Sequence, residues 1–449
     1  MSLLKKVKTT LREYPLFKRV VSSSLHLFSS NTISLVLSVL QGWLIFHLLG
    51  VGERGLFRVV MTYAATINSL LSFRMSEIVV RYGGEYIEKG EKNKASALIR
   101  AAGWTEAIVS ILAFVVVLFT AGWASEHIAH TPEIKSLFII FAIGLLANFN
   151  TETSTGILQI TGKIKLQGTI NLIQSFITFL IIAYAGFSKS SLEIILFAYL
   201  LGKCILGLGM FLIAQVHLHR AIGKIERGVP ISTLTSVREI IRFAVSSNIS
   251  ATIIKIFRES EILWVSFLIS PVAAGYYDAA YTIVGFLSIP IDPLIVTTYP
   301  EINSLVVQKA WQRLKAFLRK ITSLAFLYNI ALAFGLVVLG RWVISIYSGE
   351  EYLPAYPAML ALLIGLAFNY TLFWNRPLLL SLGLPVFPIR VTLIVGLIKI
   401  ALALFLVPRY GFVAAGALLS FYYIASVGVM AWRGVREISY QENLNREVR

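Results

Sequence analysis

Charged residues are scarce in this chain. Only 14% of its 449 residues are Asp, Glu, Lys or Arg, whereas soluble domains carry about 25%. In contrast, 57% are hydrophobic, and the mean hydropathy is +0.76. No polar stretch is long enough to form a separate soluble domain. This composition excludes an ordinary soluble fold and predicts an all-α integral membrane protein.

Cysteine and the common catalytic motifs are also nearly missing. The single cysteine, Cys204, excludes an internal disulfide and a cysteine-rich metal site. The sequence has no Walker loop, no spaced set of metal ligands and no nucleophile with a partner base. We therefore predict that the protein is not an enzyme and has no cofactor or metal, which leaves H⁺ or Na⁺ open as a coupling ion.

Long apolar runs fill the chain instead. A membrane-spanning helix needs about 20 apolar residues, and twelve runs separated by Gly, Pro and charge clusters qualify. They lie near residues 21–49, 56–79, 100–121, 136–160, 167–187, 191–215, 240–268, 275–299, 320–340, 354–380, 386–407 and 411–432. We predict a six-helix lobe at 1–215, a cytoplasmic linker at 216–238, and a second six-helix lobe with a cytoplasmic tail at 239–449.

The basic residues follow the loops on one side of the membrane. Of the 40 Lys and Arg, 28 lie in the N-terminus, the even-numbered loops and the C-terminus, six in the odd-numbered loops and six within spans. The positive-inside rule therefore places both termini in the cytoplasm, and an even number of spans requires the same. This distribution, despite a net charge of +17, argues against nucleic acid as a partner. Leu4, Val7 and Leu11 predict a short basic amphipathic helix on the inner leaflet, or else a solvated tail.

The two halves of the sequence resemble each other at a nearly constant offset. Gly55 answers Gly275 at an offset of 220, and Gly162 answers Gly383 at 221. Because each half holds six predicted spans, the repeats are parallel and are related by an axis along the membrane normal. Such a duplication is typical of transporters, whose substrate site lies between the halves.

Polar side chains recur on one face of several spans. Stripes of Ser and Thr can be ordinary helix-packing faces, but a hydrophilic cavity would require them too. The predicted cavity-lining residues are Ser30, Ser34, Gln41, Asn248, Thr252, Tyr281 and Ser288.

Charged side chains inside spans need water or a partner, because a charge in hydrocarbon is costly. The basic candidates are Arg74, Lys203, Lys255, Arg258, Arg376 and Lys399, and the acidic candidates for coupling or gating are Glu259, Glu261, Asp278 and Asp292. Pairing of Lys255 with Glu259 and of Arg258 with Glu261 is the structural alternative. Pro290 and Pro293 predict a break beside Asp292.

Four segments resemble the polysaccharide-exporter branch of the multidrug/oligosaccharidyl-lipid/polysaccharide (MOP) superfamily, the Wzx-type flippases. Residues 407–418 read VPRYGFVAAGAL, residues 270–281 read SPVAAGYYDAAY and continue to Tyr-Pro-Glu-Ile at 299–302, and similar stretches lie at 48–57 and 352–383. The resemblance implies two six-helix lobes around a central cavity and alternating access.

The resemblance also implies the substrate, an oligosaccharide linked to polyprenyl pyrophosphate, such as an O-antigen repeat unit. The intramembrane cations would then meet the pyrophosphate, and the partners would be membrane lipid, a polysaccharide polymerase and other assembly proteins. Three alternatives stay open: a cation-coupled multidrug-type exporter, a lipid II-type flippase, and a non-transporting scaffold for glycan assembly. We expect the protein in the plasma (inner) membrane.

The predicted orientation can be tested by cysteine labelling. A cysteine introduced at position 2 or 448 should be inaccessible to a membrane-impermeant maleimide in intact cells and should react after lysis, with Cys204 replaced to remove the background. Labelling of either position from outside would contradict the prediction.

Overall fold

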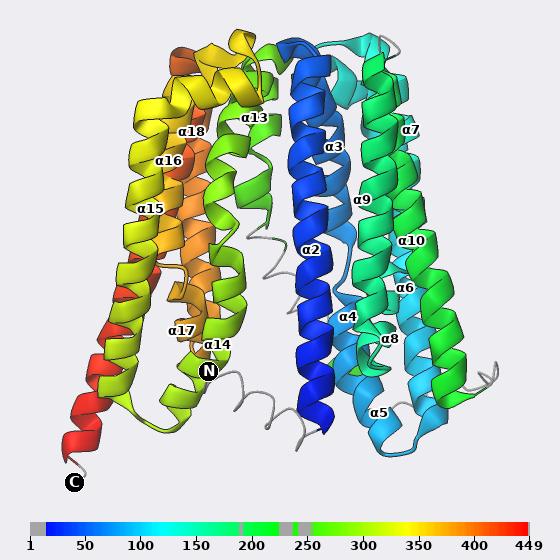
Figure 1. Ribbon diagram of the computed structural model, residues 1–449, viewed down its shortest axis with the longest axis vertical. Helices are drawn as coiled ribbons and strands as arrows, with labels where there is room; N and C mark the ends of the chain where they lie inside the picture. The colour runs from blue at the N-terminus through cyan, green and yellow to red at the C-terminus, as the bar shows by residue number, and fades with distance from the viewer. Residues whose placement is uncertain (1–14, 188–191, 224–236, 241–251, 253–254, 448–449) are drawn as a thin grey trace, which may run out of the picture. The chain divides into compact units, whose positions relative to one another are not determined.

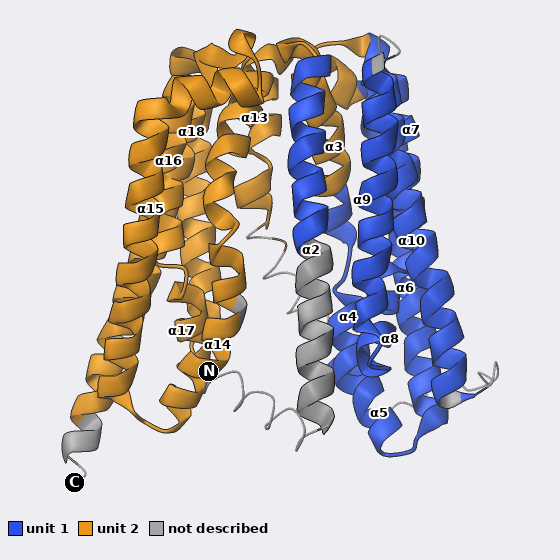
Figure 2. Ribbon diagram, in the orientation of Figure 1, with its two compact units in different colours: residues 1–48, 67–122, 133–249 blue, residues 49–66, 123–132, 250–449 orange. Residues whose placement is uncertain are grey.

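The computed structural model describes residues 15–187, 192–223, 237–240, 252 and 255–447, with side chains in the first helix described from Thr32 onward. Every regular element within these ranges is a helix (Figure 1). The predicted fold class, an all-α membrane protein, is confirmed. The chain divides into two compact units: residues 1–48, 67–122 and 133–249 form unit 1, and residues 49–66, 123–132 and 250–449 form unit 2 (Figure 2).

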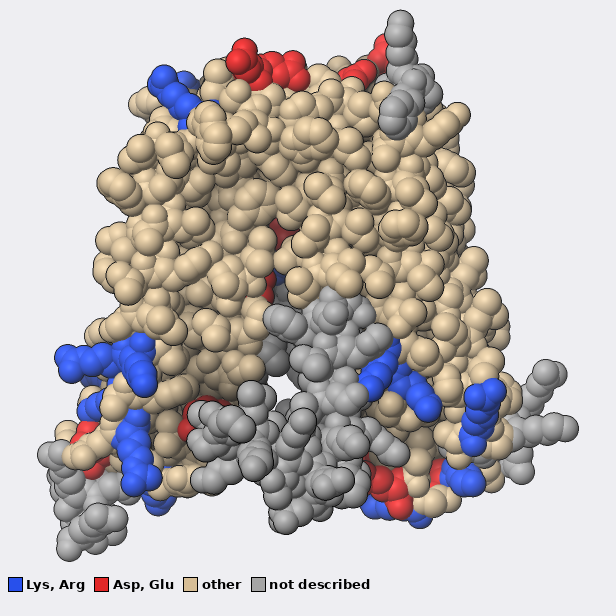
Figure 3. Space-filling view, in the orientation of Figure 1, with Lys and Arg blue, Asp and Glu red and all other residues tan. Residues whose placement is uncertain are grey.

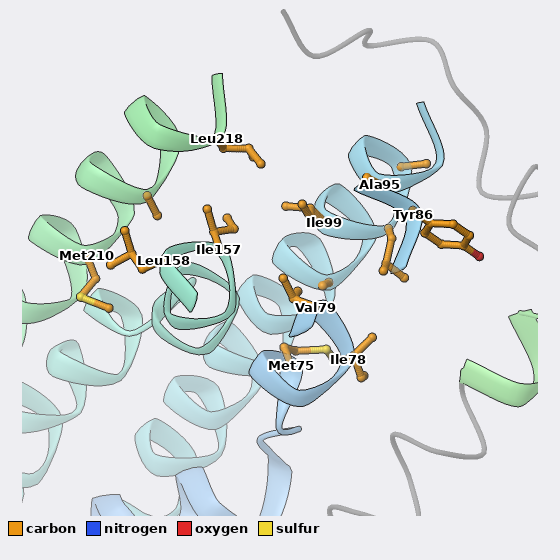
Figure 4. Close-up of a cluster of buried hydrophobic side chains, with 14 of the residues drawn as sticks. Met75, Ile78, Val79, Tyr86, Ala95, Ile99, Ile157, Leu158, Met210 and Leu218 are labelled. Atoms are coloured by element: carbon orange, nitrogen blue, oxygen red, sulfur yellow. The ribbon is translucent and has the colours of Figure 1, made fainter. Parts of the chain in front are cut away.

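Unit 1 contains most helices of the first half of the chain. They are α2 (Pro15–Leu48), the end of α3 (Val51–Leu71), α4 (Met75–Ile78), the π-helix η1 (Val79–Gly83), α5 (Gly84–Glu88), α6 (Lys92–Trp123), the 3₁₀ turn η3 (Pro132–Ile134), α7 (Lys135–Ala147), α8 (Thr151–Ile160), α9 (Ile164–Phe187) and α10 (Leu192–Ile222). One apolar core of this unit joins α4, η1, α6, α8 and α10, where Val79, Ile157 and Leu158 are fully buried (Figure 4).

Unit 2 contains the second half of the chain together with two segments from the first. Its helices are the start of α3, the π-helix η2 (Ala124–Ile128), α12 (Glu261–Leu268), α13 (Pro271–Gly285), the 3₁₀ turn η5 (Phe286–Ser288), α14 (Ile291–Val307), α15 (Trp311–Tyr347), the 3₁₀ segment η6 (Glu350–Ala355), α16 (Tyr356–Thr371), α17 (Asn375–Ser381) and α18 (Val386–Glu447). A second apolar core joins α14, α15, α17 and α18 around Leu314, Leu378 and Ile438. The predicted division at 215 and 239 stays a prediction.

Several predicted spans are broken within the structure. α3 ends before α4, α7 before α8, and α16 before α17, each with a short non-helical step. The helices on either side of Pro290 bend by 47°, because proline lacks an N–H donor and blocks the preceding helical turn. Gly411, with φ of +72°, separates the two predicted spans that form the long α18.

By length and composition, eight described helices can cross a membrane, or nine if the bent pair at Pro290 counts as one span. The predicted total of twelve therefore stays a prediction. In Figure 3, most of the visible Lys and Arg side chains lie toward the lower ends of the helices, and the middle of the visible face is uncharged except for a few charged atoms in a hollow. This distribution is the one expected of membrane-spanning helices with basic loops on one side.

The internal duplication is visible in the backbone. Gly162 and Gly383 follow the short helices α8 and α17, and both have positive φ, +68° and +76°. Only glycine adopts this conformation readily, so two positions 221 residues apart carry the same residue for the same reason.

The repeat-equivalent helices α3 and α13 cross at their equivalent glycines. A Cβ atom on Gly55 would lie 1.8 Å from the Pro271 carbonyl oxygen, and one on Gly275 would lie 2.1 Å from the Val51 carbonyl oxygen. Small residues allow such close approach of two backbones in membrane helices. The starts of α3 and α13 are therefore packed backbone against backbone.

We expect Gly55→Ala and Gly275→Ala each to destabilise the protein by about 1–3 kcal/mol, because the added methyl group overlaps a carbonyl of the neighbouring helix. Thermal unfolding of the purified protein in detergent measures the change. Gly335→Ala in α15 is the matched control, since a Cβ there has no neighbour within 4 Å and alanine favours helix. Equal melting temperatures for all three variants would contradict this packing.

Candidate functional site: a polar cavity in unit 2

The most highly charged predicted span is interrupted at Ser260. Residues 255–259 are helical, Ser260 is not, and α12 begins at Glu261. The Ser260 hydroxyl donates to the Ile256 carbonyl oxygen at 2.6 Å. The interruption places Glu261 in the first turn of a new helix, where a carboxylate is favoured by the helix dipole.

Glu261 is paired with Lys399 of α18, and both side chains are almost completely buried, at 6% and 2% exposure. The Lys399 ammonium also donates to the Phe257 carbonyl oxygen at 2.7 Å and lies 5.3 Å from the centre of the Tyr422 ring. The predicted pairing of Arg258 with Glu261 is therefore wrong. A cation on a distant helix compensates this carboxylate, which ties α12 to α18.

Arg258 is left without a carboxylate partner within the part of the chain that the structure describes. Its Nη2 atom donates to Asn369 Oδ1 at 3.1 Å, and its guanidinium carbon lies 5.1 Å from the centre of the Tyr423 ring. The guanidinium is partly buried. It is thus held by neutral groups that fix its position without cancelling its charge.

Lys255 and Glu259 form the other predicted pair, with a separation of 3.7 Å between Nζ and Oε2. Both side chains are exposed, at 46% and 58%. An exposed pair of this kind contributes about 0–1 kcal/mol, so it does little to hold the fold.

Arg258 opens into a cavity of about 390 Å³ within unit 2. This volume lies in the range of small-molecule sites. The polar lining consists of Arg258, Glu259, Tyr281, Asp292, Asn369, Tyr370, Asn375, Arg376, Thr392, Tyr422, Tyr423 and Ser426, with the rest apolar. Five of these residues, Arg258, Glu259, Tyr281, Asp292 and Arg376, are site predictions of the sequence, and the fold brings them together from 255–259, α13, α14 and α17.

The break at Pro290 positions Asp292 in this cavity. Asp292 lies in the first turn of α14, whose N-cap is Pro290. The Ser288 hydroxyl, on the preceding 3₁₀ turn, hydrogen-bonds to the Asp292 carboxylate and contacts Tyr370. Ser288, another predicted residue, therefore links the break to the cavity wall.

Asp278 lies elsewhere in unit 2 and is fully buried between two arginines of α3. Arg54 Nη2 and Arg58 Nε approach its two carboxylate oxygens at 2.7 Å and 2.6 Å. The predicted span at 56–79 contains Arg58 and leaves Arg54 outside, whereas in the structure both lie on α3, which already begins at Val51. Arg58 and Asp278 are separated by 220 residues, so repeat-equivalent positions carry opposite charges and pair beside the crossing at Gly55 and Gly275.

The remaining predicted residues lie outside the cavity. Arg74 is exposed and pairs with Glu77 at 2.6 Å, and the Lys203 ammonium lies 5.1 Å from the centre of the Phe141 ring. Gln41 donates to the Ser175 carbonyl oxygen at 2.8 Å between α2 and α9, which is a packing contact.

Four further cavity-lining predictions, two on α2 and two before Lys255, have different outcomes. Ser34 has a buried hydroxyl, and Thr252 is partly buried. Ser30 and Asn248 lie outside the described side chains.

The neutral wall of the cavity was not predicted from the sequence. Asn369 and Tyr370 lie in the predicted apolar span at 354–380, and the tyrosine pair at 422 and 423 lies in the span at 411–432; none of them was a site candidate. The signal was available, since phenol groups inside a membrane helix also need hydrogen-bond partners. No pattern in the sequence, however, indicates which helix they face.

Comparison with known proteins adds the family. A model of the polysaccharide biosynthesis protein family matches residues 20–306, more than half of the chain. The chain belongs to this family. Among curated proteins, the inner membrane protein YghQ of Escherichia coli (strain K12) is 22% identical over 349 residues, which cover 76% of this chain and 95% of that protein. The resemblance predicted from the sequence is confirmed at the level of the family.

Several solved structures of membrane transporters have a similar fold. The lipid II flippase MurJ in an inward closed conformation matches with a TM-score of 0.69 and 15% identity over 94% of this chain and 90% of MurJ. An inward-facing multidrug resistance MATE family transporter matches with a TM-score of 0.65 and 14% identity, over 91% of this chain and 96% of that one. A MOP superfamily transporter from Pyrococcus furiosus matches with a TM-score of 0.62 and 14% identity, over 95% of this chain and 96% of that one. This polysaccharide biosynthesis protein thus has the MOP fold.

We expect mutation of the two Lys–Glu pairs to reduce the stability of the protein by very different amounts. Lys399→Ala or Glu261→Ala should destabilise the protein by about 3–5 kcal/mol, because each leaves a buried unpaired charge, and the double change to Met should restore stability. Lys255→Ala and Glu259→Ala, the exposed pair, should each cost at most about 1 kcal/mol. Melting temperatures of all variants in detergent measure this difference. Equal losses for the two pairs would refute a structural role for Lys399 and Glu261.

Proposed function

We propose that this protein is a flippase that moves an oligosaccharide linked to polyprenyl pyrophosphate from the cytoplasmic to the outer face of the membrane, with the cavity around Arg258 as part of its substrate path. The family, whose description is polysaccharide biosynthesis, and the MOP fold support this proposal. The substrate class comes from the family resemblance, and the chemistry of the cavity supports it.

The observation that carries the proposal is the position of Arg258. Among the described cations on the apolar helices, Lys399, Arg54 and Arg58 are bound to buried carboxylates, and Arg74 is exposed. Arg258 instead faces a cavity and is held by an amide and a phenol ring. Burying a charge is costly unless it is paired, so a cation held by neutral groups suits an anion that arrives with the substrate.

Pyrophosphate fits this arrangement. A guanidinium binds phosphate oxygens with two parallel charge-assisted hydrogen bonds, and Arg376 lines the same cavity. The hydroxyl and amide groups of Tyr281, Asn369 and Tyr370 offer the mixed donors and acceptors that sugar hydroxyls require. An inside-negative potential favours outward movement of an anion by about 2.3 kcal/mol per charge per 100 mV.

A cation-coupled exporter of the same superfamily is the second candidate. Glu259 and Asp292 line the same cavity, and carboxylates of this kind bind H⁺, Na⁺ or organic cations. The candidates differ in ligand. A flippase recognises a polyprenyl-linked headgroup, and cells whose flippase is inactive accumulate this lipid on the cytoplasmic face. An exporter instead binds soluble cations.

The test is transport by Arg258 variants in cells that lack the native protein. Arg258→Lys should retain much of the activity because it keeps the charge. Arg258→Gln should lose about 10- to 100-fold, the equivalent of a charge-assisted hydrogen bond of about 1.5–3 kcal/mol. Lipid-linked oligosaccharide remaining on the cytoplasmic face measures the loss, and Arg319→Gln, an exposed cation on α15, is the control.

Wild-type transport by Arg258→Gln would contradict a role in substrate binding. The same assay separates the second candidate. If Asp292→Asn abolishes dependence on H⁺ or Na⁺ and the cells export an organic cation without accumulating lipid-linked glycan, the exporter function replaces the flippase.

A further inference from the structure

Unit 1 contains a second cavity that the proposed function does not use. It has a volume of about 320 Å³ and lies among α6, the break between α7 and α8, and α10. Its lining consists of Ile99, Arg100, Gly103, Trp104, Ala107, Phe149, Asn150, Thr153, Phe211, Gln215 and Leu218. All of these residues belong to unit 1.

The lining residues form a groove with one polar and one apolar end. Those of α6 and of α10 each recur every three or four positions, so each helix presents one face. The two helices run in opposite directions (Figure 1), which places Arg100 near Leu218 and Ala107 near Phe211. Figure 4 shows Ile99 and Leu218 extending toward each other from these two helices above Ile157 of α8.

The apolar end has a fixed aromatic floor. The rings of Phe149 and Phe211 lie 4.9 Å apart. Gly103 packs so closely on Asn150 that a Cβ atom would lie 2.6 Å from its Nδ2 atom. The break between α7 and α8 therefore forms the base of the groove rather than filling it.

The groove is bordered by apolar side chains that face outward. On α6 these are Trp104 at 70% exposure, Ile108 at 61% and Ile111 at 54%, and on α10 they are Leu208 at 49%, Leu212 at 62% and Val216 at 49%. Exposed apolar stripes on membrane-spanning helices contact lipid. The groove consequently opens toward the hydrocarbon region of the membrane.

The polar end of the groove is positively charged. Arg100 lines it. α6 begins nearby with Lys92 and Lys94, of which Lys94 is paired with Glu91 at 3.1 Å, and the last turn of α10 carries His219 and Arg220. Basic clusters at the ends of membrane helices attract anionic lipid headgroups. Trp104, one turn from Arg100, is of the type that lies at the level of the headgroups.

We propose that this groove is a binding site for an anionic phospholipid of the surrounding membrane. The headgroup phosphate lies against Arg100 and Trp104, and an acyl chain lies along Ala107 and the Phe149–Phe211 floor. The site is independent of the flippase function, since none of its residues lines the cavity around Arg258.

The groove is shorter than one leaflet of the membrane. Ile99 and Ala107 are about 12 Å apart along α6, at 1.5 Å per residue. This distance is shorter than one leaflet of hydrocarbon, about 15 Å. A groove of this length holds a lipid headgroup and the upper part of one acyl chain.

Native mass spectrometry of the full-length protein with added phosphatidylglycerol tests the proposal. The wild type should retain one phosphatidylglycerol in preference to diacylglycerol. Arg100→Gln, which removes the charge, and Ala107→Phe, which fills the groove, should each reduce retention by about fivefold or more. Arg100→Lys should bind as the wild type does, as should the control Arg313→Gln, an exposed cation on α15 of unit 2.

Three results would overturn the proposal: phosphatidylglycerol retained equally by Ala107→Phe, stronger retention of undecaprenyl phosphate than of phosphatidylglycerol at equal concentration, or displacement by soluble glycerol phosphate. The last two identify the substrate lipid and a free phosphate as the occupant. If Arg100→Gln does not fold, retention of phosphatidylglycerol by Ala107→Phe and Arg100→Lys shows whether the groove binds this lipid. The result does not depend on a transport assay.

Discussion

A charge inside a membrane must have a partner, and the described structure of this protein depends on how it meets that requirement. Asp278 is enclosed by Arg54 and Arg58, and Glu261 by Lys399. Each contact joins helices that are far apart in the sequence. Ion pairs that would add little in water thus fix the positions of helices here, because separating the partners would leave a buried charge.

The pairing of Glu261 with Lys399 explains why Arg258 has no carboxylate partner among the described residues. Three residues beyond it, Glu261 is compensated by a helix from the end of the chain, so Arg258 keeps its charge for the cavity. The break at Ser260 therefore separates the buried, paired charge of this short segment from the charge that lines the cavity. The same separation occurs at Pro290, where the bend places Asp292 in the cavity and leaves Asp278 in the packed interior.

The two halves of the duplicated sequence share backbone features but differ in their side chains. Backbone features are shared, as the positive φ angles of Gly162 and Gly383 and the crossing of Gly55 and Gly275 show. Side chains differ: Arg58 and Asp278 occupy equivalent positions with opposite charge, and the two cavities lie among different helices and have different linings. A repeated backbone thus carries one polar cavity in unit 2 and one lipid-facing groove in unit 1.

The sequence by itself determined the membrane class, the break at Pro290 and the duplication, because these follow from local hydropathy, proline and glycine along the chain. It also identified Arg258, Glu259, Tyr281, Asp292 and Arg376 as candidates, since charged and phenolic groups are conspicuous inside apolar runs. Which charge meets which partner was decided only by the tertiary structure. Lys399 and Glu261 are 138 residues apart and Arg54 and Asp278 are 224 apart, and no spacing along the sequence reveals contacts between helices that fold together from such distances.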